Sequence, residues 1–149
     1  MSGDRFLHES RVAFDVLGVP KPQGSMKAFM AGGNARLKPS GGSDFAAWRN
    51  AVSDAARRAG EHHEPLDGPL ALVVTFRFPM PKSRSKRDRD RGEAWKTTAP
   101  DTDKLVRTIG DALTAANLIT DDARFAIVNA TKVETTGWTG ASIAVEALT

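Results

Sequence analysis

One run of the chain, residues 69–79, consists almost entirely of β-branched, aliphatic and aromatic residues between Pro69 and Pro79. This composition is typical of a strand that lies inside a sheet, and the prolines mark its ends. The run therefore predicts a well-buried strand. With 149 residues and 40% hydrophobic content, the chain is long enough for about one ordinary domain with a core. We expect a single domain over residues 1–149.

Patterns on either side of this strand predict the other elements. Hydrophobic periodicity and turn residues indicate strands at residues 11–19, 125–133 and 141–147, helices at residues 44–59 and 102–116, and a Pro/Gly-rich connection at residues 21–42. The order strand, helix, strand, helix, strand, strand describes a small α+β domain. We expect a mixed β-sheet packed by two main helices.

Composition excludes several classes of protein. The absence of cysteine rules out disulfides, thiolate zinc sites and cysteine nucleophiles, and it favours a reducing compartment. No apolar run approaches the roughly 18 residues that span a bilayer, and the N-terminus lacks the basic-then-apolar layout of a signal peptide. Three histidines and no G-x-S-x-G motif disfavour a serine hydrolase. We expect a cytoplasmic protein with no membrane partner.

Positive charge is concentrated in residues 82–96, which hold seven basic and three acidic residues, leaving a local charge of +4. Apart from Ala94 and Trp95 the segment has no apolar side chain, so it predicts an exposed, flexible loop over about residues 82–97. Two interpretations remain open. The loop keeps the protein soluble, or it contacts phosphates and gains from the release of counterions from nucleic acid.

The helix predicted at residues 102–116 has two unlike sides when residues are placed 100° apart. Its apolar side, which should pack on the sheet, consists of Leu105, Ile109, Ala112, Leu113 and Ala116. Asp103, Arg107 and Asp111 line the opposite side, each four residues from the next. An alternating acidic and basic row is therefore expected to face outward.

Each acidic residue around this helix has an ordinary structural interpretation. Asp101 and Asp103 suit the cap and first turn of a helix, where carboxylates accept hydrogen bonds from free N–H groups. Asp111 suits an intrahelical ion pair with Arg107, worth a few tenths of a kcal/mol. The Asp pair at residues 121–122 suits a turn.

Taken together, the same residues suggest a metal site. Mg²⁺ takes oxygen ligands and keeps several waters, so two or three converging carboxylates are enough to bind it. Asp101, Asp103 and Asp122 are the candidate ligands. A metal bound there activates a water and stabilises the leaving oxygen, which is the chemistry of phosphodiester hydrolysis. A neighbouring cation would stabilise the extra charge of the transition state. The candidates are Lys104, Arg107 and Lys132.

The acidic and basic residues of this region follow a pattern of four parts, Asp101-Thr102-Asp103-Lys104-Leu105-Val106-Arg107, then Asp111-Ala112-Leu113, Asp121-Asp122-Ala123 and Lys132. This pattern resembles the RusA family of Holliday-junction resolvases. The Pro-rich basic turn at residues 19–27 resembles one that phage members often carry after their first strand. The resemblance implies a homodimeric endonuclease, dependent on Mg²⁺ or on Mn²⁺ in its place, that binds four-way junction DNA and nicks two opposed strands. It also favours a bacterial or phage-encoded origin.

Carried over position by position, the resemblance implies that Asp101, Asp103 and Asp122 bind the metal, with Asp121 as a neighbouring ligand. The family's catalytic lysine position is Arg107 here. Arginine stays protonated, so it can brace a phosphate but cannot exchange a proton as lysine can. Lys104, one turn away, is a candidate to substitute in part.

Symmetric incision of a junction requires two active sites related by a two-fold axis, which implies a dimer. The basic loop and the turn at residues 21–27 would then cradle the junction arms through phosphate contacts. The candidate DNA contacts are Lys21, Lys27, Lys82, Arg84, Lys86, Arg87, Arg89, Arg91 and Lys132. For Trp95, stacking on DNA and ordinary packing both remain open.

Two other functions remain as alternatives. Pro100-Asp101 matches the start of the PD…(D/E)xK pattern of restriction-type nucleases, but Asp122-Ala123-Arg124 supplies only Asp-x-Arg, so a general metal-dependent nuclease has weaker support. A non-catalytic DNA-binding protein would use the acidic residues only as caps and ion pairs.

Overall fold

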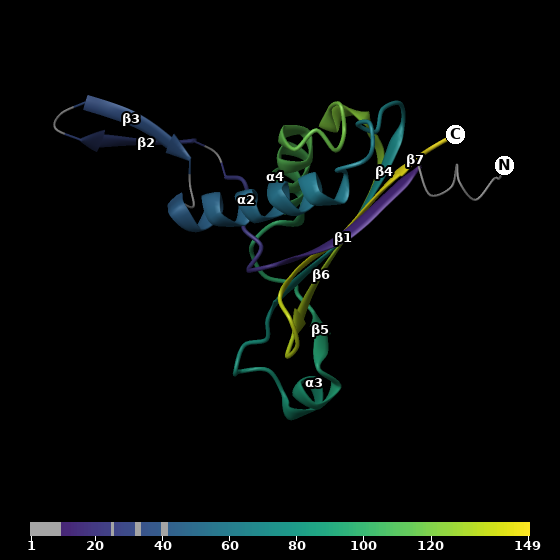
Figure 1. Ribbon diagram of the computed structural model, residues 1–149. Helices are drawn as coiled ribbons and strands as arrows, with labels where there is room; N and C mark the ends of the chain where they lie inside the picture. The colour runs from purple at the N-terminus through teal and green to yellow at the C-terminus, as the bar shows by residue number, and fades with distance from the viewer. Residues whose placement is uncertain (1–9, 25, 32–33, 40–41) are drawn as a thin grey trace.

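The computed structural model describes residues 10–24, 26–31, 34–39 and 42–149. Its main sheet has five strands in the order β1 (Arg11–Leu17), β7 (Gly140–Ala147), β4 (Leu70–Pro79), β6 (Phe125–Thr135) and β5 (Glu93–Trp95). β4 runs parallel to β6 and antiparallel to β7, and the two outer pairs are antiparallel (Figure 1). The sheet is therefore mixed, as the sequence predicts.

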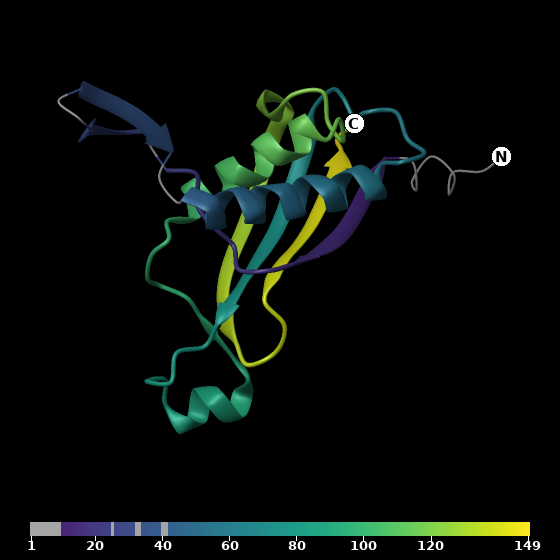
Figure 2. The ribbon, with the colours of Figure 1, turned by 60° about the vertical axis from the view of Figure 1, so that its left-hand side comes forward.

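Two long helices, α2 (Gly42–Ala59) and α4 (Thr102–Ala115), lie side by side on one face of this sheet (Figure 2). α2 packs nearer β1 and α4 nearer β6. The prediction of a small α+β domain with two main helices is confirmed. In the described part of the chain, no helix is both long enough and apolar enough to cross a membrane.

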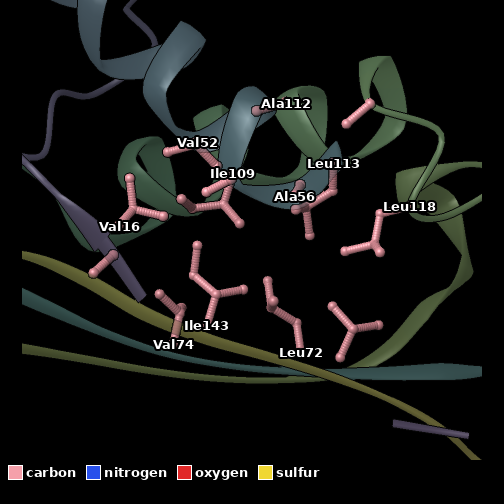
Figure 3. Packing of buried hydrophobic residues seen from close by; sticks show 14 of the residues in the cluster. Val16, Val52, Ala56, Leu72, Val74, Ile109, Ala112, Leu113, Leu118 and Ile143 are labelled. Atoms are coloured by element: carbon pink, nitrogen blue, oxygen red, sulfur yellow. The ribbon is translucent and has the colours of Figure 1, made fainter. Parts of the chain in front are cut away.

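The core lies between the helices and the sheet. Val52 and Ala56 of α2 and Ile109 of α4 point down onto Leu72 and Val74 of β4 (Figure 3). The apolar side predicted for α4 is buried, with exposed fractions of 0% for four of its residues and 8% for Ala116. β4 is the central strand, which explains why its sequence is so apolar. The side chains that it buries in the core shared with α2 and α4 are those of Leu70, Leu72, Val74, Phe76 and Phe78.

The connection predicted at residues 21–42 contains a β-hairpin. β2 (Met26–Ala31) pairs antiparallel with β3 (Asn34–Pro39), and the two form a separate sheet (Figure 1). The prediction of a connection without strands is wrong because glycine and proline, which flank and separate the two short strands in sequence, dominate the pattern.

The segment predicted as a loop at residues 82–97 contains a short helix, α3 (Lys86–Arg91), and β5. The Ser85 hydroxyl accepts a hydrogen bond from the Asp88 N–H at 3.1 Å, and Gly92, with φ 83°, ends the helix. Local polar contacts thus form a helix that buries no residue. The segment is exposed, as predicted, but it contains a helix and a strand where a loop was expected. β5 is the short edge strand beside the last residues of β6, and α3 lies next to it at the end of the sheet that is away from α2 and α4 (Figures 1 and 2).

Candidate active site

Asp101 occupies the N-cap position of α4, with φ −68° and ψ 140°, but its side chain makes no capping hydrogen bond. Only its backbone carbonyl takes part, accepting from the Leu105 N–H at 3.1 Å. The carboxylate is 65% exposed and lies 3.8 Å from the Lys104 ammonium, which is 47% exposed. The capping interpretation therefore fails for Asp101, whose carboxylate remains available to bind something else.

Asp101 and Lys104 lie on the wall of a groove of about 540 Å³ between the start of α4 and the residues that follow β1. Two further lysines, Lys21 and Lys96, line the same groove. The three lysines attract an anionic ligand, and the carboxylate of Asp101 attracts a cation that accompanies it. The rest of the lining is mostly apolar, and it consists of Val19, Pro20, Pro22, Phe78, Ala99 and Pro100.

Hydrogen bonds attach the segment after β1 to α4. The Gln23 N–H donates to the Lys104 carbonyl, and the buried Thr108 hydroxyl donates to the Lys21 carbonyl, both at 3.1 Å. The basic turn noted in the sequence therefore lies beside the first turns of α4, and Lys21 reaches the groove. Lys27 belongs to β2, and its side chain lies outside what the structure describes.

Asp122 lies beyond the end of α4 in the sequence, in a short 3₁₀ helix, η1 (Asp122–Arg124). A β-carbon added at Gly110 would meet the Asp122 Cβ at 3.0 Å and its Oδ2 at 3.2 Å. Glycine at position 110 thus lets the Asp122 side chain lie directly against the helix. Asp121 has a different task, since its carboxylate accepts from the Ala123 N–H at 3.0 Å and caps η1.

The two neighbouring carboxylates have opposite electrostatic shifts. Burial, followed by the hydrogen bond with Asp121 and the negative charge of Asp111, raises the pKa of Asp122 above its usual value. The hydrogen bonds from the Ala123 N–H and from Asp122, helped by Arg124, lower the pKa of Asp121. The Asp111 and Asp121 carboxylates thus repel a negative charge on Asp122, and a cation bound nearby would reduce this repulsion.

The carboxylates form two groups along α4. Asp103 and Gly110 share a helix face, but seven residues separate them by about 10 Å along the axis. Within the described residues no three Asp, Glu or His side chains lie close enough together to hold a metal. Among these residues the predicted ion pair between Arg107 and Asp111 is also absent, and Asp111 acts on Asp122 instead.

The basic candidates differ in how many protein partners they have. Arg84 donates to Glu134 at 2.7 Å and to the Trp95 carbonyl at 2.8 Å, and the Glu134 carboxylate raises the pKa of Arg84. Arg89 donates to two carbonyls, and Lys86 pairs with Asp90. These three side chains hold the α3 region together. Lys21, Lys82, Arg87 and Arg91 have no ion-pair partner in the described ranges and remain candidates for phosphate contacts.

Lys132 also has protein partners. Its ammonium donates to the carbonyls of Thr98 at 2.9 Å and Pro100 at 2.8 Å. The sequence gives no sign of this role, because it depends on β6 lying next to the loop before Asp101. Two other residues were missed for the same reason. Lys96 enters the groove only through the β5–β6 pairing, and the buried Glu134 is recognisable only from its contacts with Arg84 and Lys96.

Comparison with protein families matches the chain to the family model described as "Endodeoxyribonuclease RusA" over residues 18–146. A search of curated proteins found no match. The matched range includes the groove, α4, η1 and β6. The resemblance seen in the sequence is thus confirmed over most of the chain, and the protein is an enzyme. The chain belongs to the RusA family of endodeoxyribonucleases, the Holliday-junction resolvases.

Proposed function

We propose that this enzyme resolves four-way DNA junctions by hydrolysing one phosphodiester bond in each of two opposed strands, with Mg²⁺ as its cofactor and Mn²⁺ as a substitute. One observation carries the proposal. Asp101 stands where a helix cap is expected, yet its carboxylate makes no capping hydrogen bond and faces a groove lined by three lysines. A purely structural aspartate at this position would cap the helix.

The residues present fit such a metal. Asp101 and Asp103 offer hard carboxylate oxygens at the start of α4, and Mg²⁺ is commonly held by one or two carboxylates together with water and substrate phosphate. When bound, the ion supplies an activated water and stabilises the leaving oxygen. Lys21 and Lys104 hold the DNA backbone in the groove, where their charges attract the phosphate toward Asp101.

Arg107 lies on the same face of α4 as Asp103, one turn further along. Because a guanidinium stays protonated at any working pH, Arg107 contributes a fixed positive charge to the transition state and transfers no proton. This role suits the position where the family has its catalytic lysine.

A second copy of the chain is the partner that paired incision requires, and the edge of β6 is the surface we propose for it. β5 pairs only with Val133–Thr135, and no other described strand covers the outer edge of β6 before that point. Residues 125–131 carry no charge, and Ile127 and Val128 are 51% and 48% exposed. An uncharged, apolar sheet edge is a template for pairing with another strand.

Antiparallel pairing of two β6 edges about a two-fold axis near Val128 would also complete the site. Six residues to either side of Val128, residue 122 would lie level with residue 134 of the other copy. Residue 134 is close to Lys132, which contacts the loop before Asp101. Asp122 of the partner subunit would thus approach Asp101 and Asp103, which supports a metal site shared between two copies.

The test is cleavage of a synthetic four-way junction with a fixed crossover, resolved on a denaturing gel over a range of MgCl₂ concentrations. We expect paired nicks that need Mg²⁺ or Mn²⁺, and binding without cleavage in Ca²⁺. A junction that is bound but never nicked in any divalent metal would support the non-catalytic alternative. A linear duplex of the same sequence, cut equally well, would support a general nuclease.

The cell compartment follows from the substrate. A resolvase acts where branched DNA forms during recombination and repair, so we propose that the enzyme works in the cytoplasm of a bacterial host, encoded by the host or by a phage.

A further inference from the structure

The Lys132 side chain holds the loop that leads into α4, residues 96–100, by two hydrogen bonds. Lys132 lies on β6, next to Val133, which pairs with Trp95 of β5. Its ammonium donates to the Pro100 carbonyl at 2.8 Å and to the Thr98 carbonyl at 2.9 Å. Two of its three N–H donors are therefore directed at backbone oxygens, and the side chain is half-buried.

The same loop is held at its other end. The Lys96 ammonium donates to the Thr98 hydroxyl at 3.0 Å and lies 3.5 Å from the buried Glu134 carboxylate, which also accepts from Arg84 at 2.7 Å. Lys132 and Glu134 are two residues apart on β6, so their side chains point to the same face of the sheet. Residues 96–100 are thus tied to two neighbouring positions of one strand.

We propose that Lys132 is a positioning residue that fixes the carboxylate of Asp101 through the Thr98 and Pro100 carbonyls, and that it does not contact DNA phosphates. This inference rests on the proposed metal-dependent cleavage. Asp101 directly follows Pro100, and its side chain makes no capping hydrogen bond. Its backbone is fixed on one side by the bond from the Leu105 N–H to its carbonyl and on the other side by the preceding loop. A carboxylate held in place before the metal arrives binds it with a smaller loss of conformational freedom.

A phosphate contact and a positioning role predict different results for Lys132→Met, which removes the donors and keeps the length of the side chain. If Lys132 positions Asp101, the half-saturating Mg²⁺ concentration for nicking rises by about tenfold or more, as for other groups that orient metal ligands. Junction affinity in Ca²⁺, and its dependence on salt, stay as in the wild type. Lys132→Arg, which keeps hydrogen-bond donors, restores part of the Mg²⁺ affinity.

Lys82→Met is the matched contrast, because Lys82 lies in the basic segment and has no ion-pair partner among the described residues. Loss of one phosphate contact weakens junction binding and lowers the slope of log K against log salt by about 1, with the Mg²⁺ requirement unchanged. The same pattern in Lys132→Met would overturn the proposal.

Three outcomes separate the possible failures. Thermal unfolding and junction binding in Ca²⁺ show whether Lys132→Met is folded. If it is not, Lys132→Arg decides, and weaker junction binding in Ca²⁺ together with a wild-type Mg²⁺ requirement contradicts the proposal. A folded Lys132→Met with a wild-type Mg²⁺ requirement also overturns it. Failure of the wild-type enzyme to nick junctions would instead refute the proposed function itself.

Discussion

Three aspartates show how the same residue type takes different roles. Asp121 caps η1, Asp67 accepts hydrogen bonds from two side chains, and the Asp101 carboxylate has no such contact. The amino-acid sequence around each aspartate does not separate these roles, because each position suits a helix cap or a turn equally well. Reactivity is therefore assigned to the carboxylate with no structural hydrogen bonds.

Arg107→Lys tests whether this position supplies only charge. Both side chains are cationic at neutral pH, so we expect the nicking rate to stay within about tenfold of the wild type, measured in single-turnover reactions at saturating Mg²⁺. Arg107→Gln, which removes the charge, is the control and should lower the rate by on the order of a hundredfold. A lysine variant as slow as the glutamine variant would show that the guanidinium geometry matters.

Asp67 makes stability depend on pH. The hydrogen bond from Thr120, followed by those from the Gly68 N–H and Arg124, lowers the pKa of Asp67 below its ordinary value of 3.8. A lowered pKa in the folded state adds stability that is fully present above about pH 3.8 and is lost as the pH falls further. In urea titrations at pH 7 and pH 3, Asp67→Asn should lose more stability at pH 7 than at pH 3. An equal loss at both pH values would contradict this.

At the scale of elements, α4 organises the site. Its apolar side packs on the sheet, its N-terminal end presents Asp101 and Lys104 to the groove, and Gly110 makes room for Asp122. The helix is a rigid platform that fixes these positions relative to one another.

Gly110→Ala tests this arrangement. Alanine favours a helix over glycine by about 1 kcal/mol, but its Cβ would approach the Asp122 Cβ to 3.0 Å and push the side chain away. We expect little net change in thermal stability together with a nicking rate reduced by about tenfold or more. Thr114→Ala, a substitution on the same face one turn further along, serves as the control. Full activity of Gly110→Ala would mean that the placement of Asp122 does not limit catalysis.

Sequence patterns predicted the elements that bury many apolar side chains. β4 and α4 were recognisable because a central strand and an amphipathic helix have strong apolar patterns. α3 was missed because capping and ion pairs such as Lys86–Asp90 stabilise it without any core residue. Similarly, Asp101 was predicted as a site residue, but Lys96 and the partners of Lys132 depend on strand pairing between distant parts of the chain. The role of Gly110 depends on how η1 packs against α4.

At the scale of the whole molecule, the outer edge of β6 before Val133 is covered by no other described strand, and it is the surface proposed for a second copy. Ile127 and Val128 are half exposed on a strand segment with no charge. Soluble proteins usually protect such edges with charged residues, prolines or short strands. The absence of these features along residues 125–131 supports a dimer built on this edge.

Ile127→Lys should break that dimer. A lysine on an edge strand opposes pairing because its charge would be desolvated in the interface. We expect the wild type to elute as a dimer in size-exclusion chromatography with light scattering, and the variant as a folded monomer that no longer nicks junctions. Arg11→Lys on β1, at the opposite edge of the sheet, is the control. A fully dimeric Ile127→Lys would place the interface elsewhere.

The most direct test of the central claim is the single-turnover nicking rate of Asp101→Asn on a four-way junction at saturating Mg²⁺, measured together with junction affinity in Ca²⁺. If the uncapped Asp101 carboxylate is part of a metal-dependent active site, the rate falls by on the order of 10²–10³-fold or more. Affinity is retained or increases, because a negative charge beside the DNA backbone has been removed. A nicking rate equal to that of the wild type would contradict the account.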